Sequence, residues 1–194
     1  MEEVCLCLCK EVKENYHEHG KVKESKLITK RISGQMLIEI IEKLKNAGVG
    51  TGWVERRKRL AKLDIGRAYI SFIGSDPCHV QWVFDSSDNE KLALYYKGEY
   101  PALHAGEAIL EHALTLPAYR RKGIHQKSRH QIIEIERENF KIRKFLSFIN
   151  PNNIPSIKVA INQGFVPTMI RKEKWFLFKK KFVFEEYKED LLHY

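Results

Sequence analysis

The chain has 194 residues, of which 43% are hydrophobic and 30% charged, a composition typical of globular proteins and unlike disordered or collagen-like chains. This length fits one domain, which buries enough surface to fold without metals or disulfides. The formal net charge of +9 predicts an anionic ligand or partner. Charge alone does not distinguish nucleic acid, phospholipid and a phosphorylated cofactor.

The N-terminal segment predicts no export signal. Met1-Glu2-Glu3 is followed by six apolar residues, whereas a secretory signal needs a basic start and a longer apolar run. No stretch approaches the ~18 apolar residues of a membrane span. We therefore expect a cytoplasmic protein without a membrane partner.

Three of the four cysteines, Cys5, Cys7 and Cys9, alternate along one predicted strand. Alternation places the thiols on one face and the aliphatic residues between them on the other. We expect the thiols to be buried as small hydrophobic groups. A metal site that joins them to His17 and His19 matches no common zinc spacing and is disfavoured.

Strands and helices are predicted in mixed order along the chain. Strands are expected at 4–13, 21–31, 68–73, 79–84, 106–116, 145–149, 165–178 and 181–187. Helices are expected from Ser33-Gly34 to Gly48, and over about 53–63, 121–139 and 154–163. Turns are expected at 14–20 and at Lys179-Lys180-Lys181, and residues 86–104 should hold a turn and a shorter strand. This order implies an α/β protein with helices packed on a mixed sheet.

The segment after the strand at 106–116 carries the most informative chemistry. Residues 117–130 contain no acidic side chain and five cations, Arg120, Arg121, Lys122, Lys127 and Arg129. A helix N-terminus presents free backbone N–H groups and the positive end of the helix dipole. Cations and a glycine at such a place predict a pyrophosphate site. The spacing excludes a Walker loop and the dinucleotide Gly-x-Gly-x-x-Gly fingerprint.

This segment resembles motif A of the GNAT superfamily of N-acetyltransferases, Arg/Gln-x-x-Gly-x-Gly/Ala after a strand that ends in a Pro-x-x turn. Arg120 and Gly123 match the first two anchors. His125 stands where Gly or Ala is usual. We expect its side chain either to crowd the cofactor or to point away and leave its amide in place.

A second match lies downstream at the expected distance. Asn153-x-x-Ser156-x-x-x-Ala160-x-x-x-Gly164-Phe165 is similar to motif B of the family, Asn-x-x-Ala-x-x-x-Tyr-x-x-x-Gly-Phe. Ser156 is a small replacement, whereas Ala160 stands where a tyrosine could protonate the departing thiolate. The resemblance covers about 68–178, and residues 1–65 are compatible with the variable acceptor side of the family.

The resemblance implies a GNAT fold over 1–194 as a single domain. Its central sheet would be mixed, mostly antiparallel and flanked by helices, with a splay between two parallel strands, 106–116 and 144–150. Acetyl-CoA is the implied co-substrate, and no metal is implied.

The resemblance also assigns the binding residues. The pyrophosphate would lie beside Arg120 on the amides of Arg121, Lys122, Gly123, Ile124 and His125. The pantetheine arm would pair with backbone around Ala113, Leu114 and Thr115. Asn153 and Ser156 would contact the arm or the phosphates from the far side of the splay.

The implied reaction is direct attack of a primary amine on the thioester of an acetyl or other short acyl group. Freeing an amine of pKa about 10.4 at pH 7 costs about 4.6 kcal/mol, so a general base helps. Glu107 and Glu111 share parity with Ala113 and Thr115 and should face the same way in a regular strand. Glu111 is the first candidate base. A bulge would break this parity and favour His112.

A basic run, Glu55-Arg56-Arg57-Lys58-Arg59, adjoins Trp53. It predicts a solvated helix face, or else contacts with nucleic acid or with an acceptor that carries phosphate or carboxylate. Two alternative functions stay open. One is a basic nucleic-acid-binding module, which is disfavoured because no RNA-binding aromatic motif matches. The other is a GNAT-fold protein that binds CoA without turnover. The acceptor is not defined by the sequence, and a homodimer is compatible with this fold.

Overall fold

The computed structural model describes residues 3–13, 26–177 and 179–188. The turn expected at 14–20, with His17 and His19, lies outside these residues. So does the first part of the strand expected at 21–31.

The described strands form one eight-stranded sheet in the order β2-β3-β4-β5-β6-β1-β7-β8. The strands are β1 Glu3–Glu11, β2 Leu27–Ile32, β3 Arg67–Ile73, β4 Asp76–Asp85, β5 Glu107–Thr115, β6 Lys144–Ile149, β7 Val166–Phe176 and β8 Lys179–Glu186. Only the β5–β6 pair is parallel within this sheet. The prediction of a mixed, mostly antiparallel sheet is confirmed.

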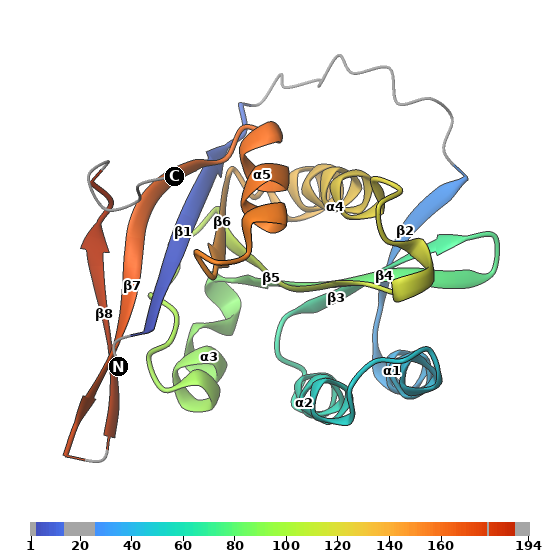
Figure 1. The fold of residues 1–194 in the computed structure, drawn as a ribbon, viewed down its shortest axis with the longest axis horizontal. Helices are drawn as coiled ribbons and strands as arrows, with labels where there is room; N and C mark the ends of the chain where they lie inside the picture. The colour runs from blue at the N-terminus through green and yellow to red at the C-terminus, as the bar shows by residue number, and fades with distance from the viewer. Residues whose placement is uncertain (1–2, 14–25, 178, 189–194) are drawn as a thin grey trace.

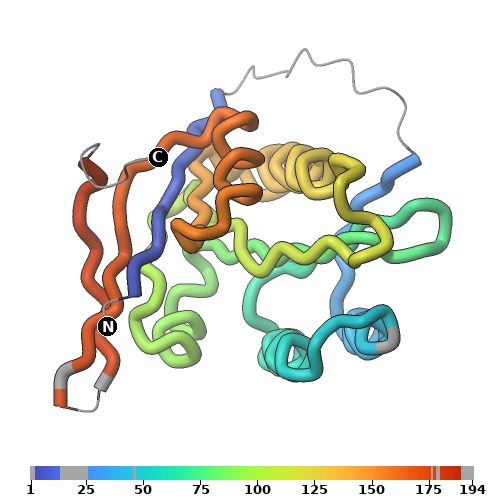
Figure 2. Tube along the Cα trace, viewed as in Figure 1, coloured from blue at the N-terminus to red at the C-terminus, as the bar shows by residue number. Residues whose placement is uncertain are grey.

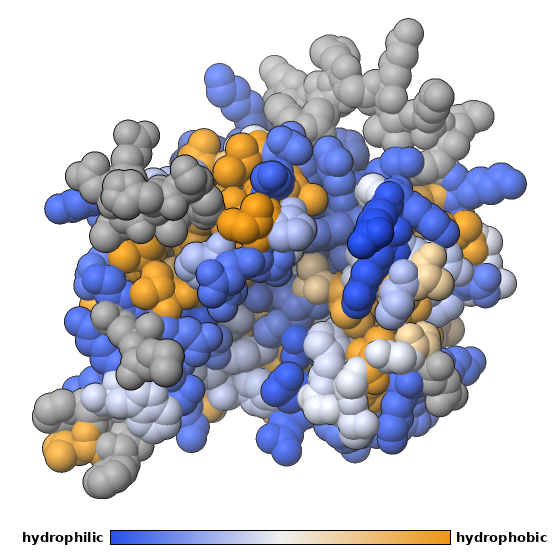
Figure 3. All heavy atoms as spheres, viewed as in Figure 1, coloured by the Kyte–Doolittle hydropathy of each residue, from blue (hydrophilic) through white to orange (hydrophobic). Residues whose placement is uncertain are grey.

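Five described helices cover the two faces of the sheet. They are α1 Gly34–Asn46, α2 Thr51–Lys62, α3 Asn89–Tyr96, α4 Ile124–Phe140 and α5 Ile154–Asn162. Helices α1, α2 and α3 lie on one face, and α4 and α5 lie on the other (Figures 1 and 2). In the same view, hydrophilic residues cover most of the surface, while hydrophobic ones gather over α5, where Ile161 is half exposed (Figure 3).

The sheet separates two hydrophobic cores, and the alternation in β1 supplies both. Cys7 and Cys9 pack on the α1–α3 side, whereas Leu6 and Leu8 pack on the α4–α5 side. Burial raises the pKa of the Cys5 thiol to about 12, so this thiol stays protonated near neutral pH. The prediction that the three thiols share one packed face is confirmed.

A buried ion-pair network ties α4 to the sheet. The Arg67 guanidinium of β3 donates to Glu136 Oε1 of α4 at 2.7 Å and to Asp85 Oδ2 of β4 at 2.6 Å. The Tyr69 hydroxyl also donates to Glu136 Oε1, at 2.7 Å. Because these groups lie beneath the helix, they tie the C-terminal half of α4 to β3 and β4.

One predicted strand is a helix. Residues 86–104 contain α3, preceded by a 3-10 turn at Ser86–Asp88. The Asp85 carboxylate accepts the Ser87 N–H at 2.8 Å, and Asp88 Oδ2 accepts the Asp85 N–H at 3.1 Å. This reciprocal cap satisfies the free donors of the first turn and favours a helical start over a strand.

One predicted turn is a strand. Lys179-Lys180-Lys181 begins β8, in which Lys180 pairs with Trp175 and Lys181 pairs with Lys174. Lys180 Nζ lies 2.7 Å from the Glu173 carboxylate, so the cross-strand ion pair accommodates the charge in an extended segment.

Candidate active site in the strand splay

The two parallel strands separate part-way along their length. Regular pairing joins Glu107, Ala108 and Ile109 of β5 to Lys144, Phe145 and Leu146 of β6. Beyond this point side chains bridge the gap. Ser147 Oγ donates to the Leu110 carbonyl at 3.1 Å, and the Phe148 N–H donates to Glu111 Oε1 at 3.0 Å. The structure thus contains the splay that the sequence predicts between these strands.

Strand β5 contains a bulge at the splay. Val80 and Trp82 of β4 pair with Leu114 and Glu111, so two steps along β4 span three along β5. His112 lies in this interval with a φ of 58°, in the left-handed region. The bulge shifts the alternation of side chains by one residue.

The bulge overturns the parity prediction for β5. Glu107 and Glu111 precede it, whereas Ala113 and Thr115 follow it. Thr115 Oγ1 is 2.9 Å from His79 Nδ1 on the α4 side, while Leu114 packs against the α1–α3 core. The four residues therefore do not share one face.

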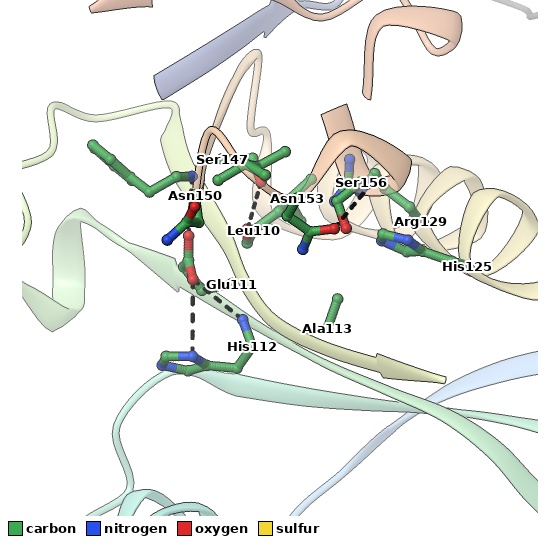
Figure 4. Close-up of a pocket in the computed structure, with 12 residues that line it drawn as sticks. Leu110, Glu111, His112, Ala113, His125, Arg129, Ser147, Asn150, Asn153 and Ser156 are labelled. Carbon is green, nitrogen blue, oxygen red and sulfur yellow. Dashed lines mark hydrogen bonds and ion pairs between the residues drawn. The ribbon is translucent and has the colours of Figure 1, made fainter. Parts of the chain in front are cut away.

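A pocket of about 200 Å³ occupies the splay. It is lined by Leu110, Glu111, His112 and Ala113 of β5, Ser147, Phe148, Ile149 and Asn150 at β6, His125 and Arg129 of α4, and Asn153 and Ser156 at α5. Glu111 and Asn150 lie at one end, and Asn153, Ser156, His125 and Arg129 lie at the other (Figure 4). Six predicted site residues thus meet here: Glu111, His112, Ala113, His125, Asn153 and Ser156.

Glu111 is a buried carboxyl group at the inner end of the pocket. Burial raises its pKa to about 7, against the opposing effect of the hydrogen bond from the Phe148 N–H. Only 13% of its side chain is exposed. A carboxyl group that titrates near neutral pH is suited to accept a proton under physiological conditions.

His112 also lines the pocket, and its ring turns to the opposite side of β5 from Asn153 and Ser156 (Figure 4). Its Nε2 is 2.6 Å from the Tyr96 hydroxyl of α3. Burial, and then the positive charges of Arg57 and Arg56, hold its pKa well below the usual range. The ring is therefore neutral at physiological pH.

Glu107 is not brought to the pocket. It lies where β5 and β6 still pair, and its carboxylate accepts from Lys144 Nζ at 2.8 Å and from the His104 N–H at 3.0 Å. Burial would raise its pKa, but the hydrogen bond and charge of Lys144 lower it on balance. The structure therefore gives Glu107 an ion-pair role and no place near the candidate base.

Helix α4 begins beside the outer end of the splay without a side-chain cap. Gly123 is its N-cap in the left-handed conformation, with φ of 69°. The first backbone N–H groups of the helix, including those of Ile124 and His125, have no acceptor within the helix. Arg120, Arg121 and Lys122 are exposed around this end, whereas the Ile124 side chain packs inward. This arrangement can bind an anion.

The end of β5 offers backbone groups to the splay. The Leu116 N–H donates to the Cys78 carbonyl of β4 at 3.0 Å. Since alternate residues point their backbone groups in opposite directions, those of Ala113 and Thr115 point away from β4. Arg120 Nε donates to the Thr115 carbonyl at 3.2 Å.

The His125 side chain lies in the pocket and does not point away from it. Its ring stacks on that of His79, with 5.3 Å between centroids. Burial, followed by the charge of Arg129, holds its pKa well below the usual range. Of the two predicted orientations, the structure has the one that crowds the pocket.

Arg129 is a pocket residue that the sequence analysis did not single out. It is 2% exposed, and its Nε and Nη1 have no hydrogen-bond partner among the described residues. Burial lowers its pKa to about 10, so it remains charged. It is one of the five cations of 117–130, and sequence spacing alone does not separate a buried cation from a solvated one.

Helix α5 supplies the far wall. Asn153 caps it, accepting the Ser156 N–H at 3.4 Å, and both residues line the pocket. Ala160 is fully buried in the α4–α5 core. The position of the family tyrosine therefore provides no proton donor to the pocket.

Within the described residues, no group of three or more His, Cys, Asp or Glu side chains is arranged to hold a metal ion. In this same part of the chain, no helix is both long and apolar enough to cross a membrane.

The fold is that of known acetyltransferases. No family model matches the sequence, and no curated protein matches it. A GCN5-related N-acetyltransferase from Kribbella flavida matches with a TM-score of 0.51 and 12% identity over 84% of this chain and 54% of that one. A protein assigned to the GNAT acetyltransferases of Novosphingobium aromaticivorans matches with a TM-score of 0.57 and 11% identity over 89% and 63%.

A conserved protein of unknown function from Staphylococcus epidermidis matches equally well, with a TM-score of 0.57 and 10% identity over 89% of this chain and 60% of that one. The chain thus spans only 54–63% of the length of these three structures. Likeness at this level of identity establishes the GNAT fold, as the two sequence motifs predict.

Proposed function

We propose that the protein is an acyl-CoA-dependent N-acyltransferase that moves an acetyl or other short acyl group to a primary amine. One observation carries this proposal. A single pocket in the β5–β6 splay contains a carboxyl group of near-neutral pKa, Glu111, and reaches His125 in the first turn of α4, a helix whose N-terminus has no side-chain cap.

The residues around the splay fit a phosphorylated thioester carrier. The first-turn amides of α4, with the exposed Arg120, Arg121 and Lys122, would bind the pyrophosphate of acetyl-CoA. The backbone groups of Ala113 and Thr115 would pair with the pantetheine arm. Bound in this way, acetyl-CoA supplies an activated acyl group at the inner end of the splay.

The far wall of the pocket supports the same ligand. Asn153 and Ser156 provide hydrogen-bonding groups at α5, and Arg129 provides a buried guanidinium with two unpartnered nitrogens. A buried donor without an acceptor costs free energy, which a phosphate or amide oxygen of the carrier would recover.

Glu111 would act as the general base. Its carboxylate accepts a proton from the amine, directly or through a water, as the amine nitrogen bonds to the acyl carbon. The tetrahedral intermediate collapses when the C–S bond breaks and the electron pair leaves on the thiolate. With a pKa of about 8.5, a thiolate is a competent leaving group. It takes a proton from solvent, because Ala160 offers none.

The acceptor would approach from the α1–α3 side of β5. His112 and Tyr96 lie there, next to α2. The N-terminal portion up to about residue 65 would therefore form part of the acceptor side.

A thermal melt with acetyl-CoA tests the proposal, with adenosine 3′,5′-bisphosphate and short DNA as comparison ligands. At ~100 times its dissociation constant, a ligand adds about 2.7 kcal/mol of stability. For a chain of this size, the melting temperature should rise by roughly 5–10 °C. A rise with DNA and none with acetyl-CoA would instead favour the basic nucleic-acid-binding module.

Turnover is measured next as amine-dependent thiol release from acetyl-CoA. Release establishes the transferase. Stabilisation by acetyl-CoA without release from any amine would identify a GNAT-fold protein that binds CoA and does not catalyse transfer.

A further inference from the structure

Helix α2 contains a buried arginine that forms no ion pair within the described residues, although the charge of Glu111 reaches it. Arg57 is 7% exposed, while Arg56 and Arg59 on the same helix are exposed. Its Nε is buried without a hydrogen-bond partner, and no carboxylate of the described residues forms an ion pair with it. Burial lowers its pKa. A charge left unpaired in the interior is costly, so a partner from outside the chain would stabilise it.

Aromatic rings hold the guanidinium in place. Its Cζ is 5.0 Å from the centroid of the Trp53 ring and 6.0 Å from that of Trp82. Stacking of this kind recovers part of the lost hydration without supplying a negative charge. Of the guanidinium nitrogens of Arg57, Nε is the one that is fully buried without a hydrogen-bond partner.

Arg57 lies beside the proposed acceptor path. Trp82, which it contacts, is the β4 partner of Glu111. The positive charge of Arg57 reaches His112 and Tyr96, which line or border the same side of β5. The guanidinium and the candidate base thus lie on the same side of β5.

The carboxylates of this region are engaged elsewhere. Glu99 lies 3.3 Å from Arg171, and the Glu42 carboxylate accepts from Lys58. Tyr96 and Tyr100 stay neutral because burial raises the pKa of each hydroxyl. A simple cationic amine would therefore meet Arg57 without a compensating anion other than Glu111.

We propose that Arg57 binds an oxyanion, a carboxylate or a phosphate, carried by the acceptor, so that the substrate is a small anionic amine. This inference rests on the proposed transferase function. The planar guanidinium fork matches both oxyanions with paired hydrogen bonds. A nucleic-acid backbone does not fit, because so little of Arg57 is exposed.

Matched acceptor pairs test the proposal. Thiol release from acetyl-CoA is measured with β-alanine against β-alaninamide, and with O-phosphoethanolamine against ethanolamine. The wild-type protein should favour one anionic member by about 30-fold or more in kcat/KM, because losing one partner of a buried charge pair has an effect of that order. The pair with the larger ratio identifies carboxylate or phosphate. Equal or reversed preference in both pairs would overturn the proposal.

Variants locate the preference. Arg57→Gln should reduce the ratio to about 1, by raising KM for the anionic amine with kcat kept, since the contact is made equally in ground and transition states. Arg57→Lys keeps the charge without the fork and should retain part of the preference. Arg59→Gln removes an equal charge from the exposed face of α2 and should leave the ratio unchanged. A ratio that survives Arg57→Gln would refute the assignment.

Direct binding separates this inference from the transferase function. Because Trp53 and Trp82 bracket the guanidinium, β-alanine or O-phosphoethanolamine should change tryptophan emission in the wild type and in Arg59→Gln, but not in Arg57→Gln. A saturable change without any thiol release would leave the anion site standing and the transferase function wrong. Thiol release with neither selectivity nor a fluorescence change would support the transferase function and refute the anion site.

Discussion

Among the described residues, each face of the sheet buries one arginine that forms no ion pair with an acid, and the two settings differ. Arg129, on the α4–α5 face, lines a pocket shared with Asn153, Ser156 and His125. Arg57, on the opposite face, contacts the indole rings of Trp53 and Trp82. The first setting offers many donors around one cation and suits a large polyanionic carrier. The second offers one guanidinium packed against indole rings, and suits a single oxyanion.

Replacing the candidate base should have the largest effect on turnover, because the proposed acyl-CoA side and the proposed acceptor side meet at Glu111. Glu111→Gln should lower kcat by about 10²- to 10⁴-fold, the usual contribution of a general base. Acetyl-CoA should still raise the melting temperature. Wild-type kcat/KM should rise with pH up to about 7, where Glu111 loses its proton.

Glu107→Gln is the matched control, since that carboxylate is paired with Lys144 away from the pocket. Its turnover should stay near that of the wild type. A variant at Glu111 that turns over normally would remove the base from this mechanism.

Acid should destabilise the α4 face through His79. Burial lowers the pKa of His79 to about 3, whereas a histidine in the unfolded chain has a pKa of about 6.5. The unfolded chain therefore binds the proton first, and stability present above pH 6.5 is lost as the pH falls toward 3. Two pH units below 6.5 correspond to about 3 kcal/mol of unfolding free energy.

His79→Gln should flatten this loss between pH 6.5 and 4.5 by keeping a polar partner for Thr115 without a titrating ring. Unfolding by urea at each pH measures it. Parallel curves for variant and wild type would show that His79 does not carry the acid sensitivity.

Arg129→Met should affect binding and stability differently on the α4–α5 face, where acetyl-CoA is proposed to bind. Acetyl-CoA affinity should fall about 30-fold, the order expected for the loss of a buried charged donor. The free energy of unfolding should stay the same or rise by about 1–4 kcal/mol, because an unpaired buried charge is replaced by a methionine of similar length.

Lys158→Met, on the exposed side of α5, removes the same charge and should change neither quantity. Isothermal titration with acetyl-CoA decides the outcome. Undiminished affinity in Arg129→Met would mean that the cation faces no part of the carrier.

The smallest expected effect is on the free energy of unfolding, which the ionised form of Glu111 lowers. The folded-state pKa of Glu111 is raised to about 7, so its stabilising, protonated form is complete below the unfolded value and is lost as the pH rises through 7. Glu111→Gln should therefore gain roughly 1–3 kcal/mol over the wild type between pH 5 and pH 8. A difference that does not grow with pH would contradict the raised pKa.

The sequence predicts the residues on the proposed acyl-CoA side of the site more fully than those on the proposed acceptor side. Gly123 at a helix start and Asn153 at a cap act within a few residues of chain, so local pattern predicts them. His112 becomes a pocket residue only through the register between β4 and β5, which spacing within β5 does not reveal. Arg57 reads as one member of a solvated basic run, and only packing against Trp82 of a distant strand shows that it is buried.

Local chemistry also explains the two wrong elements. Asp85 and Asp88 form a reciprocal cap, which favours a 3-10 turn and a helix over 86–96, although the apolar content there allows a strand. The ion pair of Lys180 with Glu173 extends a lysine run that composition assigns to a turn. In both places the structure shows side-chain contacts that the periodicity of the sequence does not reveal.

The one-residue bulge at His112 puts the two halves of β5 out of phase. Glu111 before it and Thr115 after it, which regular alternation would place together, face opposite sides of the sheet, so one strand can serve the proposed acceptor on one face and the proposed carrier on the other. Substitutions on the leading half would retune the acceptor without disturbing the trailing half that meets the donor. Deleting a residue at the bulge would restore regular alternation along β5. The side chains that now face opposite sides of the sheet would then face the same side.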